Sequence, residues 1–195
     1  MYPVGEYDLA GFAVGVVEKS AIIDGKTIEP GDRVLGLPSS GLHSNGYSLA
    51  RTVLLERAKI PLAEIGDDLL RPTRIYVKAL KTAIAAGGVR GCAHITGGGL
   101  VDNPPRVLRA GLAMRLHEDR WKLPPIFSRI AELGPVDKSE MRRTFNCGLG
   151  MLIVVQRDHF DLVKHALSSV GEVAYDVGEI FLADDSAAEP YVEFA

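Results

Sequence analysis

Several signatures that would place this sequence in a common functional class are missing from it. It has only two cysteines, Cys92 and Cys147, without CxxC spacing and with no secretory signal before them. Two such thiols are typical of a reduced, cytoplasmic protein. No apolar run reaches the ~18 residues of a membrane span, so we expect no membrane partner. The five histidines have no HExxH or comparable spacing, so we expect no metal site built by this chain.

Signatures of nucleotide and nucleic-acid binding are missing as well. Neither the GxGxxG motif of dinucleotide-binding folds nor the GxxxxGK[ST] phosphate loop occurs. Basic residues form no cluster and the formal net charge is −3, so we expect no nucleic-acid partner. The chain has 195 residues, of which 47% are hydrophobic, which is enough for one self-sufficient core. We therefore expect a single domain over residues 1–195.

Short apolar runs alternate with amphipathic helical patterns along the chain. Strands are expected at 9–18, 33–37, 92–95, 112–116, 149–155, 173–182 and 191–194, and helices at 49–58, 72–85, 100–108, 124–133 and 158–170. Residues 60–70 are expected to form a linker, Asp24-Gly25 a hairpin turn, and residues 184–186 a turn. This mixture predicts an α+β or mixed α/β fold, with one mixed sheet covered by helices.

The most informative stretch is a turn rich in small residues between a buried strand and a helix. Residues 39–48 have the sequence Ser-Ser-Gly-Leu-His-Ser-Asn-Gly-Tyr-Ser. The polar and glycine positions of this turn are Ser39, Ser40, Gly41, His43, Ser44 and Asn45. Backbone N–H groups at such a turn favour an anion such as a phosphate. A polar loop capped by Ser44 or Asn45, with His43 facing water, is the simpler alternative, but a cap accounts for only one of these residues. We predict a ligand-binding turn.

A second turn, His94-Ile95-Thr96-Gly97-Gly98-Gly99, repeats the order of strand, glycine-rich turn and helix. Consecutive glycines let backbone N–H groups point toward a ligand and approach it closely. A run of three glycines alone is more often a flexible turn. Its repetition of the first arrangement favours a second ligand-binding wall.

Two further residues have a functional and a structural interpretation. Arg74 lies in the first turn of the helix that Pro72 is expected to open, where a cation opposes the helix dipole. Either a phosphate partner or a salt bridge would offset this, and the sequence does not decide between them. Cys147 could be a nucleophile, but no histidine is visibly linked to it, so a buried thiol is the preferred interpretation.

Five segments of the chain occur in the order in which they stand in one enzyme family. They are Tyr7-Asp8-Leu9-Ala10-Gly11-Phe12, the turn at 39–48, Pro72-Thr73-Arg74-Ile75-Tyr76, the turn at 94–99, and Arg143-Thr144-Phe145-Asn146-Cys147-Gly148. Through them nearly the whole chain resembles the C-terminal half of phosphoribosylformylglycinamidine cyclo-ligases, also called aminoimidazole ribonucleotide synthetases.

The resemblance implies a three-layer α/β/α unit with a mixed sheet. It also implies a part in an ATP-dependent ring closure of purine biosynthesis, which converts formylglycinamidine ribonucleotide to aminoimidazole ribonucleotide, ADP and phosphate. Enzymes of the family are homodimers with two domains, and the N-terminal domain holds most of the Mg–ATP. The implied partners are thus a phosphorylated ribonucleotide, an N-terminal domain and a second subunit.

The resemblance also implies roles for individual residues. His43 would transfer a proton or bind the developing iminophosphate oxygen, because an imidazole titrates near neutrality. The first turn would hold substrate oxygens through Ser39, Ser40, Gly41, Ser44 and Asn45, and Arg74 is a further candidate for substrate binding. The opposite wall of the cleft would be lined by Thr96, Gly97, Gly98 and Gly99, and Asn146 would be a third polar wall. Phosphoryl transfer depends mostly on positioning and charge neutralisation, which suits this neutral polar lining.

The chain departs from the family in lacking an Asp-Gly-Val-Gly-Thr-Lys-type segment. We therefore expect the N-terminal half to be absent and the chain alone to have no cyclo-ligase activity. The alternatives are a related ATP-using enzyme, such as selenophosphate synthetase or thiamine-monophosphate kinase, and a non-catalytic module that binds a phosphorylated metabolite. The long Ser-Asn-Gly-Tyr motif favours the cyclo-ligase.

Overall fold

One mixed sheet runs through the molecule. The computed structural model describes residues 5, 7, 10–184 and 189–195. Within these residues the sheet has six strands in the order β2-β4-β1-β5-β3-β6. The strands are β1 (Arg33–Pro38), β2 (Val89–His94), β3 (Leu112–Leu116), β4 (Leu149–Val155), β5 (Tyr175–Leu182) and β6 (Tyr191–Phe194). Neighbours are antiparallel except β3 and β6, which are parallel.

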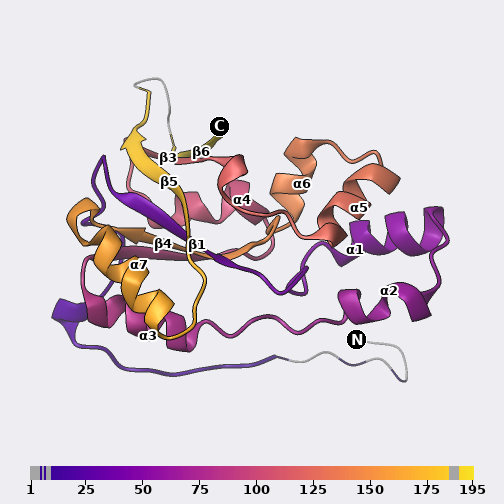
Figure 1. Cartoon of the computed structure of the whole chain (residues 1–195), viewed down its shortest axis with the longest axis horizontal. Helices are drawn as coiled ribbons and strands as arrows, with labels where there is room; N and C mark the ends of the chain where they lie inside the picture. Colours follow the sequence, from indigo (N-terminus) through magenta and orange to yellow (C-terminus); the bar gives the residue numbers. More distant parts are fainter. Residues whose placement is uncertain (1–4, 6, 8–9, 185–188) are drawn as a thin grey trace.

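Helices cover both faces of this sheet (Figure 1). The α-helices are α1 (Tyr47–Arg51), α2 (Leu62–Leu69), α3 (Val77–Ala86), α4 (Gly99–Asp102), α5 (Pro125–Leu133), α6 (Lys138–Thr144) and α7 (Phe160–Ser169). A π-helical segment, η2 (Thr52–Arg57), continues α1. The 3-10 segments are η1 (Lys19–Ala21), η3 (Pro104–Val107), η4 (Glu118–Arg120) and η5 (Arg157–His159). In the part of the chain that the structure describes, no helix has the length and apolarity needed to cross a membrane.

Two hydrophobic cores lie on opposite faces of the sheet. One packs α3 and α7 against Leu35 and Leu37 of β1 and alternate residues of β4. The other packs α1, α2, α4, α5 and α6 against the reverse face, with Phe127 and Phe145 fully buried. Because side chains of a strand alternate between faces, a core on each side makes the sheet the middle of three layers. The prediction of a three-layer α/β/α fold with a mixed sheet is confirmed.

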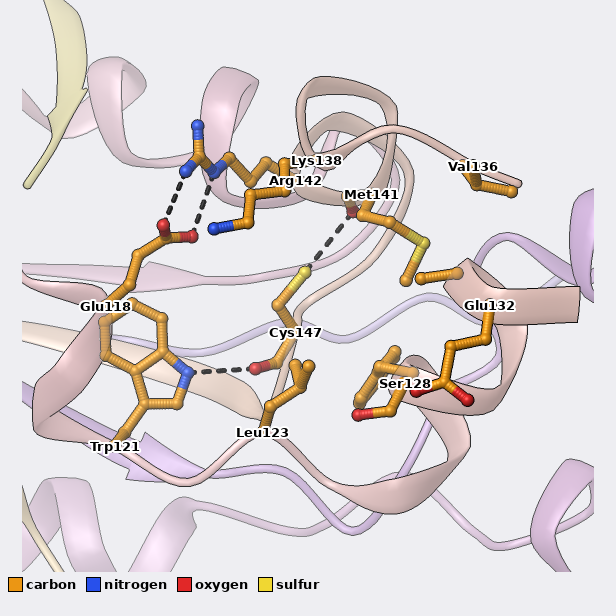
Figure 2. Close-up of a pocket in the computed structure, with 12 residues that line it drawn as sticks. Glu118, Trp121, Leu123, Ser128, Glu132, Val136, Lys138, Met141, Arg142 and Cys147 are labelled. Carbon is orange, nitrogen blue, oxygen red and sulfur yellow. Dashed lines mark hydrogen bonds and ion pairs between the residues drawn. The ribbon is translucent and has the colours of Figure 1, made fainter. Parts of the chain in front are cut away.

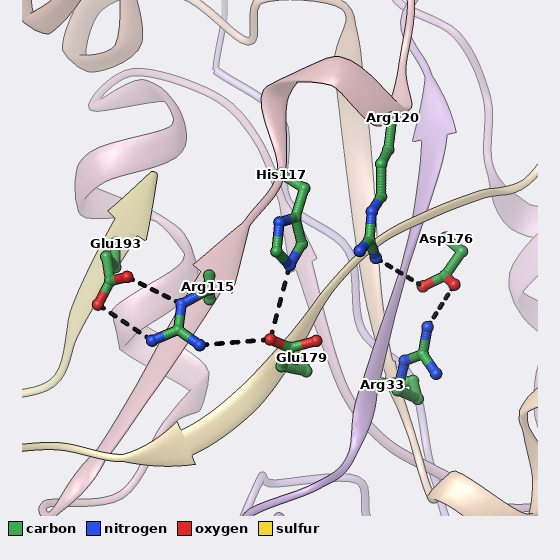
Figure 3. Close-up of polar contacts among 7 residues, drawn as sticks. All are labelled: Arg33, Arg115, His117, Arg120, Asp176, Glu179 and Glu193. Carbon is green, nitrogen blue, oxygen red and sulfur yellow. Dashed lines mark hydrogen bonds and ion pairs between the residues drawn. The ribbon is translucent and has the colours of Figure 1, made fainter. Parts of the chain in front are cut away.

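The β5-β3-β6 side of the α3/α7 face carries ion pairs instead of an apolar core (Figure 3). Arg115 of β3 lies between Glu193 of β6, at 2.8 Å, and Glu179 of β5, at 3.5 Å. Arg33 of β1 pairs with Asp176 of β5. Opposite charges that face each other across neighbouring strands stabilise this half-exposed surface modestly.

The predicted buried strand at 9–18 is wrong for the residues that the structure describes. Leu9 lies outside them, and residues 10–18 pair with no strand. Phe12, Val14 and Val16 are 96%, 99% and 101% exposed. Their alternation is that of a strand, but no sheet edge of the described chain lies beside them to accept the backbone hydrogen bonds.

Other boundaries also differ from the sequence-based expectations. Residues 62–69 form α2 and are not a linker, because Ile65 and Leu69 reach the core. Helix α3 begins at Val77, five residues after Pro72. The segment before it is anchored because the Arg74 N–H donates to His43 Nε2 and the Tyr76 hydroxyl donates to the Pro38 carbonyl oxygen. Asp24-Gly25 forms a turn without strands.

Helix α6 was not predicted, although Asp137 is its N-cap and accepts a hydrogen bond from the Glu140 N–H at 2.9 Å. Of the expected turn at 184–186, residues 185 and 186 lie outside the described residues.

Candidate functional site

The two predicted turns lie against each other in the fold. A Cβ added to Gly97 of the second turn would be 3.7 Å from Oδ1 of Asn45 in the first turn. The imidazole rings of His43 and His94 are 6.4 Å apart, centroid to centroid. This proximity arises because β1 and β2 both pair with β4, so the turns that follow them leave the sheet at nearby points.

The segment before β4 packs beneath both turns. A Cβ on Gly46 would lie 2.8 Å from Thr144 Cγ2, and one on Gly99 would lie 2.7 Å from the Phe145 carbonyl oxygen. Only glycine fits such close approach, and the φ of Gly99 is +56°. The glycines of the two motifs therefore let three chain segments converge.

His43 is the buried centre of the first turn and is only 3% exposed. Its Nε2 accepts hydrogen bonds from the backbone N–H groups of Ser40, at 3.0 Å, and Arg74, at 3.3 Å. A nitrogen that accepts has no proton, so the neutral ring carries its proton on Nδ1. That Nδ1 is buried and has no hydrogen-bond partner among the described residues.

Burial, together with the neighbouring His94 and Arg74, lowers the pKa of His43 to about 4. The imidazole is therefore neutral at pH 7. The expectation that this side chain titrates near neutrality is wrong for the structure described here, because protonation of Nε2 would break two backbone hydrogen bonds.

The backbone of the first turn is strained at its centre. His43 and Ser44 have φ angles of +54° and +58°, which non-glycine residues seldom adopt. The Asn45 side chain donates a hydrogen bond to the His43 carbonyl oxygen at 2.6 Å and so holds this conformation. Ser44 is exposed, and the hydroxyl of Ser39 is buried without a hydrogen-bond partner in the part of the chain that the structure describes. The Ser39 hydroxyl is thus an unsatisfied buried polar group of this turn.

The second turn is shaped by a residue that sequence reasoning missed. Asn103, which is 3% exposed, accepts hydrogen bonds from Thr96 N–H, at 2.5 Å, and from Thr96 Oγ1, at 3.2 Å. It donates one to the Gly97 carbonyl oxygen at 2.9 Å. In the sequence, only the position of Asn103 shortly after the three glycines indicates that it could support the second turn.

Asn146 connects the third segment to the first turn. Its Nδ2 donates to the Gly41 carbonyl oxygen at 2.8 Å, and its Oδ1 accepts from the Gly148 N–H at 2.9 Å. With 1% exposure it is satisfied inside the protein. The structure gives this side chain a positioning contact and not a free polar surface.

Arg74 is also engaged within the protein. Its guanidinium forms an ion pair with Glu172 and donates to the Pro38 carbonyl oxygen at 3.0 Å, and it lies over the Tyr76 ring. Of the two interpretations of this residue, the geometry favours the salt bridge. Since α3 begins at Val77, the guanidinium does not oppose that helix's dipole from its first turn.

A hollow of about 280 Å³ opens beside the first turn. Ser40 and Gly41 line it together with Asp68, Arg71 and the segment 124–126. Residues 96–99 do not line it, so the two turns adjoin without sharing this hollow. Arg71 pairs with Asp68 at 2.9 Å while half-exposed, which makes it a cation that sequence reasoning overlooked.

Comparison with known proteins relates this site to one family. The family model "AIR synthase related protein, C-terminal domain" matches residues 29–188. A protein of Bordetella petrii named phosphoribosylformylglycinamidine cyclo-ligase is 53% identical, with 98% of this chain and 57% of that protein covered. The chain thus spans little more than half the length of the curated relatives that it matches.

Solved structures share the fold at low sequence identity. Thiamine-monophosphate kinase from Stenotrophomonas maltophilia has a TM-score of 0.60 at 16% identity, covering 91% of this chain and 54% of its own. The hydrogenase maturation protein HypE, solved in complex with ATP, has a TM-score of 0.56 at 16% identity, covering 88% and 50%. The match of the family model to residues 29–188 shows that this chain belongs to the AIR synthase related proteins as their C-terminal domain.

Proposed function

We propose that the chain is the C-terminal part of a phosphoribosylformylglycinamidine cyclo-ligase. In this role it would help convert formylglycinamidine ribonucleotide to aminoimidazole ribonucleotide, with ATP as the second substrate. The observation that carries the proposal is the match to cyclo-ligase relatives at about 50% identity over 98% of the chain. The two turns that carry the resemblance also meet in space.

The first turn would hold the phosphorylated substrate. Ser39 Oγ and the Nδ1–H of His43 are the buried polar groups there without a partner among the described residues. A neutral imidazole can donate from Nδ1 to a substrate oxygen but has no second proton to release at pH 7. We therefore assign His43 oxygen binding and support of the turn, in preference to acid catalysis.

The second turn would form the facing wall. Asn103 fixes this turn before any ligand arrives, because it accepts from the Thr96 N–H and donates to the Gly97 carbonyl oxygen. The N–H groups of the glycines that follow Thr96 would be the donors. Preorganised donors stabilise developing negative charge more than mobile ones do, since they need no reorganisation during the reaction. Asn146 and Arg74 would act through the positions of Gly41 and Pro38.

The donors of this chain suit phosphate oxygens better than a magnesium ion. Hydroxyl, amide and backbone N–H groups surround the turns, and no three His, Cys, Asp or Glu side chains of the described residues gather as a metal site. We propose that Mg–ATP is held mainly by an N-terminal domain. ATP use is in keeping with the ATP complex of HypE, which shares the fold.

An N-terminal domain would also account for the exposed segment at 10–18. Phe12, Val14 and Val16 place apolar side chains in water, and burial of each would contribute roughly 1.5–3 kcal/mol. A neighbouring domain that offers a sheet edge would pair this backbone and cover these side chains. We propose the same partner for the site and for the segment.

The test is a chimera that joins this chain to the part of the Bordetella petrii relative that it does not cover. ATP-dependent formation of aminoimidazole ribonucleotide is measured for the chimera and for the 195-residue chain. We expect turnover by the chimera and none by the chain alone. Turnover by the isolated chain, or a folded chimera that binds ATP without turnover, would contradict the proposal.

A matched pair of serine variants distinguishes a role in substrate binding from a general effect of replacing a serine. Ser39→Ala in the chimera removes the unpartnered hydroxyl and is expected to lower kcat/KM about tenfold or more. Ser169→Ala, at the exposed end of α7, is expected to leave kcat/KM unchanged. If the two variants change kcat/KM equally, Ser39 does not contact the substrate.

A further inference from the structure

A cavity of about 350 Å³ lies between α5 and α6, and no residue of the two turns lines it (Figure 2). Buried side chains of Trp121, Phe127, Met141 and Cys147 line its inner part. This volume lies near the lower end of the ~300–1,000 Å³ typical of small-molecule pockets. The cavity has room for one compact ligand.

Cys147 belongs to the apolar lining and is not a reactive group. Burial raises the pKa of its thiol to about 12, and Sγ donates to the Met141 carbonyl oxygen at 3.4 Å. The prediction of a buried thiol is confirmed. The indole Nε1 of Trp121 donates to the Cys147 carbonyl oxygen at 2.9 Å, so the polar atom of this aromatic wall is already satisfied.

Helical spacing places polar groups around the mouth. Ser128 and Glu132 are four residues apart on α5, and Lys138 and Arg142 are four apart on α6, so each pair shares one helix face. Figure 2 shows Glu132 on one helix and Lys138 on the other. Both side chains are exposed and flank the mouth, with Glu132 beside Ser128 and Lys138 on the side of Arg142 and Glu118.

The charges at the mouth differ in whether they are neutralised. Arg142 forms two hydrogen bonds to the Glu118 carboxylate, at 2.9 Å and 2.5 Å. Glu132 and Lys138 form no ion pair with any residue that the structure describes. The cavity thus combines an apolar interior with one unpaired carboxylate and one unpaired ammonium.

We infer that this cavity binds a small zwitterion with an apolar body, the chemistry of an amino acid with an aromatic side chain. The ligand's ammonium pairs with Glu132, its carboxylate pairs with Lys138, and its ring packs against Trp121 and Met141. A ring beside an indole and a thioether makes favourable aromatic and sulfur contacts. This site is independent of the proposed ring closure.

Two consecutive residues of the chain connect the cavity to the candidate site. Cys147 lines the cavity, and the preceding Asn146 braces the first turn through Gly41. A ligand in the cavity would therefore contact the segment that supports that turn.

Three probes with one phenyl ring test the inference on the 195-residue chain. L-phenylalanine carries both charges, 3-phenylpropionate only the carboxylate, and phenethylamine only the ammonium. Trp121 is the single tryptophan of the chain and lines the cavity, so its fluorescence, excited at 295 nm, reports occupation. Calorimetry provides an independent affinity.

We expect L-phenylalanine to bind with a Kd of roughly 0.1–1 mM, as its number of atoms allows. Each singly charged probe should bind about tenfold more weakly. No saturable binding of L-phenylalanine, or equal binding of all three probes, would overturn the inference.

Charge variants assign each contact. Lys138→Gln should reduce L-phenylalanine binding about tenfold and leave phenethylamine binding unchanged. Glu132→Gln should reduce L-phenylalanine binding equally and leave 3-phenylpropionate binding unchanged. The controls, Lys81→Gln on α3 and Glu56→Gln in η2, are exposed, lie outside the cavity lining and should change nothing. Loss of binding in a control, or none in both cavity variants, would overturn the assignment.

Discussion

Two apolar segments that both read as strands in the sequence differ completely in this fold. In residues 10–18, Phe12 and Val14 are 96% and 99% exposed, whereas Val34 and Leu35 of β1 are 0% exposed. Strand β1 pairs with β4 and β5 on its two edges and faces a core on each side. The comparison shows that an alternating apolar pattern indicates a segment that requires a neighbouring strand. The pattern does not indicate which part of the protein supplies that strand. For residues 10–18, we propose that it lies in an N-terminal domain.

The strongest test of this contrast places the same charge in both segments. Val34→Asp buries a carboxylate without a partner in the central strand, so it should lower the free energy of unfolding by about 4 kcal/mol or more. Val14→Asp should change it by less than ~0.5 kcal/mol. Urea unfolding of both variants provides the measurement. A comparable loss in Val14→Asp would show that the segment has a partner within this chain.

In the chimera, Val14→Asp should behave differently. If the N-terminal domain covers residues 10–18, the variant should destabilise the joined protein by roughly 2 kcal/mol or more although the isolated chain is unaffected. If Val14→Asp leaves the stability of the chimera unchanged, residues 10–18 do not form the proposed contact with the N-terminal domain.

A matched pair of glycines sharpens the contrast at the site. A Cβ on Gly150 of β4 would collide with the Tyr76 hydroxyl and lie 2.6 Å from His43 Cε1, whereas one on Gly15 would meet no atom of the described residues within 4 Å. Gly150→Ala should therefore cost about 2–3 kcal/mol of stability, and Gly15→Ala about zero. Thermal unfolding compares the two. A neutral Gly150→Ala would mean that the packing beneath the first turn is loose.

The outcome shows which sequence signals were sufficient. Strands β3, β4 and β6 begin and end where apolar runs predicted, because each run is bounded by turn residues and packs within the same sheet. Helix α2 was missed because its Ile65 and Leu69 are too few to show a period before their packing is known. The start of α3 was misplaced because hydrogen bonds from Arg74 and Tyr76 to distant residues, not local preference, set the path of the chain before the helix.

At the candidate site the residue types were more predictable than their contacts. The two turns were located from small and polar residues, and they do adjoin. The pairing of Arg74 with Glu172 joins positions 98 residues apart, which no local pattern reveals. Asn103 and the neutral state of His43 likewise depend on burial, which only the folded structure supplies.

Histidine offers the same contrast between a buried and an exposed side chain. The pKa of His43 is lowered from its usual value of 6.5 to about 4, so the unfolded chain binds more protons between these values. Stability should therefore fall as the pH drops from 6.5 toward 4. His43→Gln should remove this part of the pH dependence, whereas His165→Gln, at an exposed position, should keep it. Parallel stability profiles of wild type and His43→Gln would contradict the buried, neutral ring.

The smallest expected effects compare two ion pairs. Glu172→Gln leaves the half-buried Arg74 without its carboxylate and should cost about 1–2 kcal/mol. Asp68→Asn breaks the exposed pair with Arg71 and should cost less than ~0.5 kcal/mol. Chemical unfolding resolves the difference. The reverse order would mean that Arg74 is held mainly by Pro38 and the Tyr76 ring.

The central claim is that the two turns together hold a phosphorylated ribonucleotide. Titration of the ¹⁵N-labelled chain with aminoimidazole ribonucleotide, followed by backbone amide chemical shifts, tests it most directly. We predict saturable shifts that concentrate in residues 39–45 and 96–99 and that are absent from α3 and α7. Shifts confined to one turn or located elsewhere, or no shifts at millimolar ligand, would contradict the account.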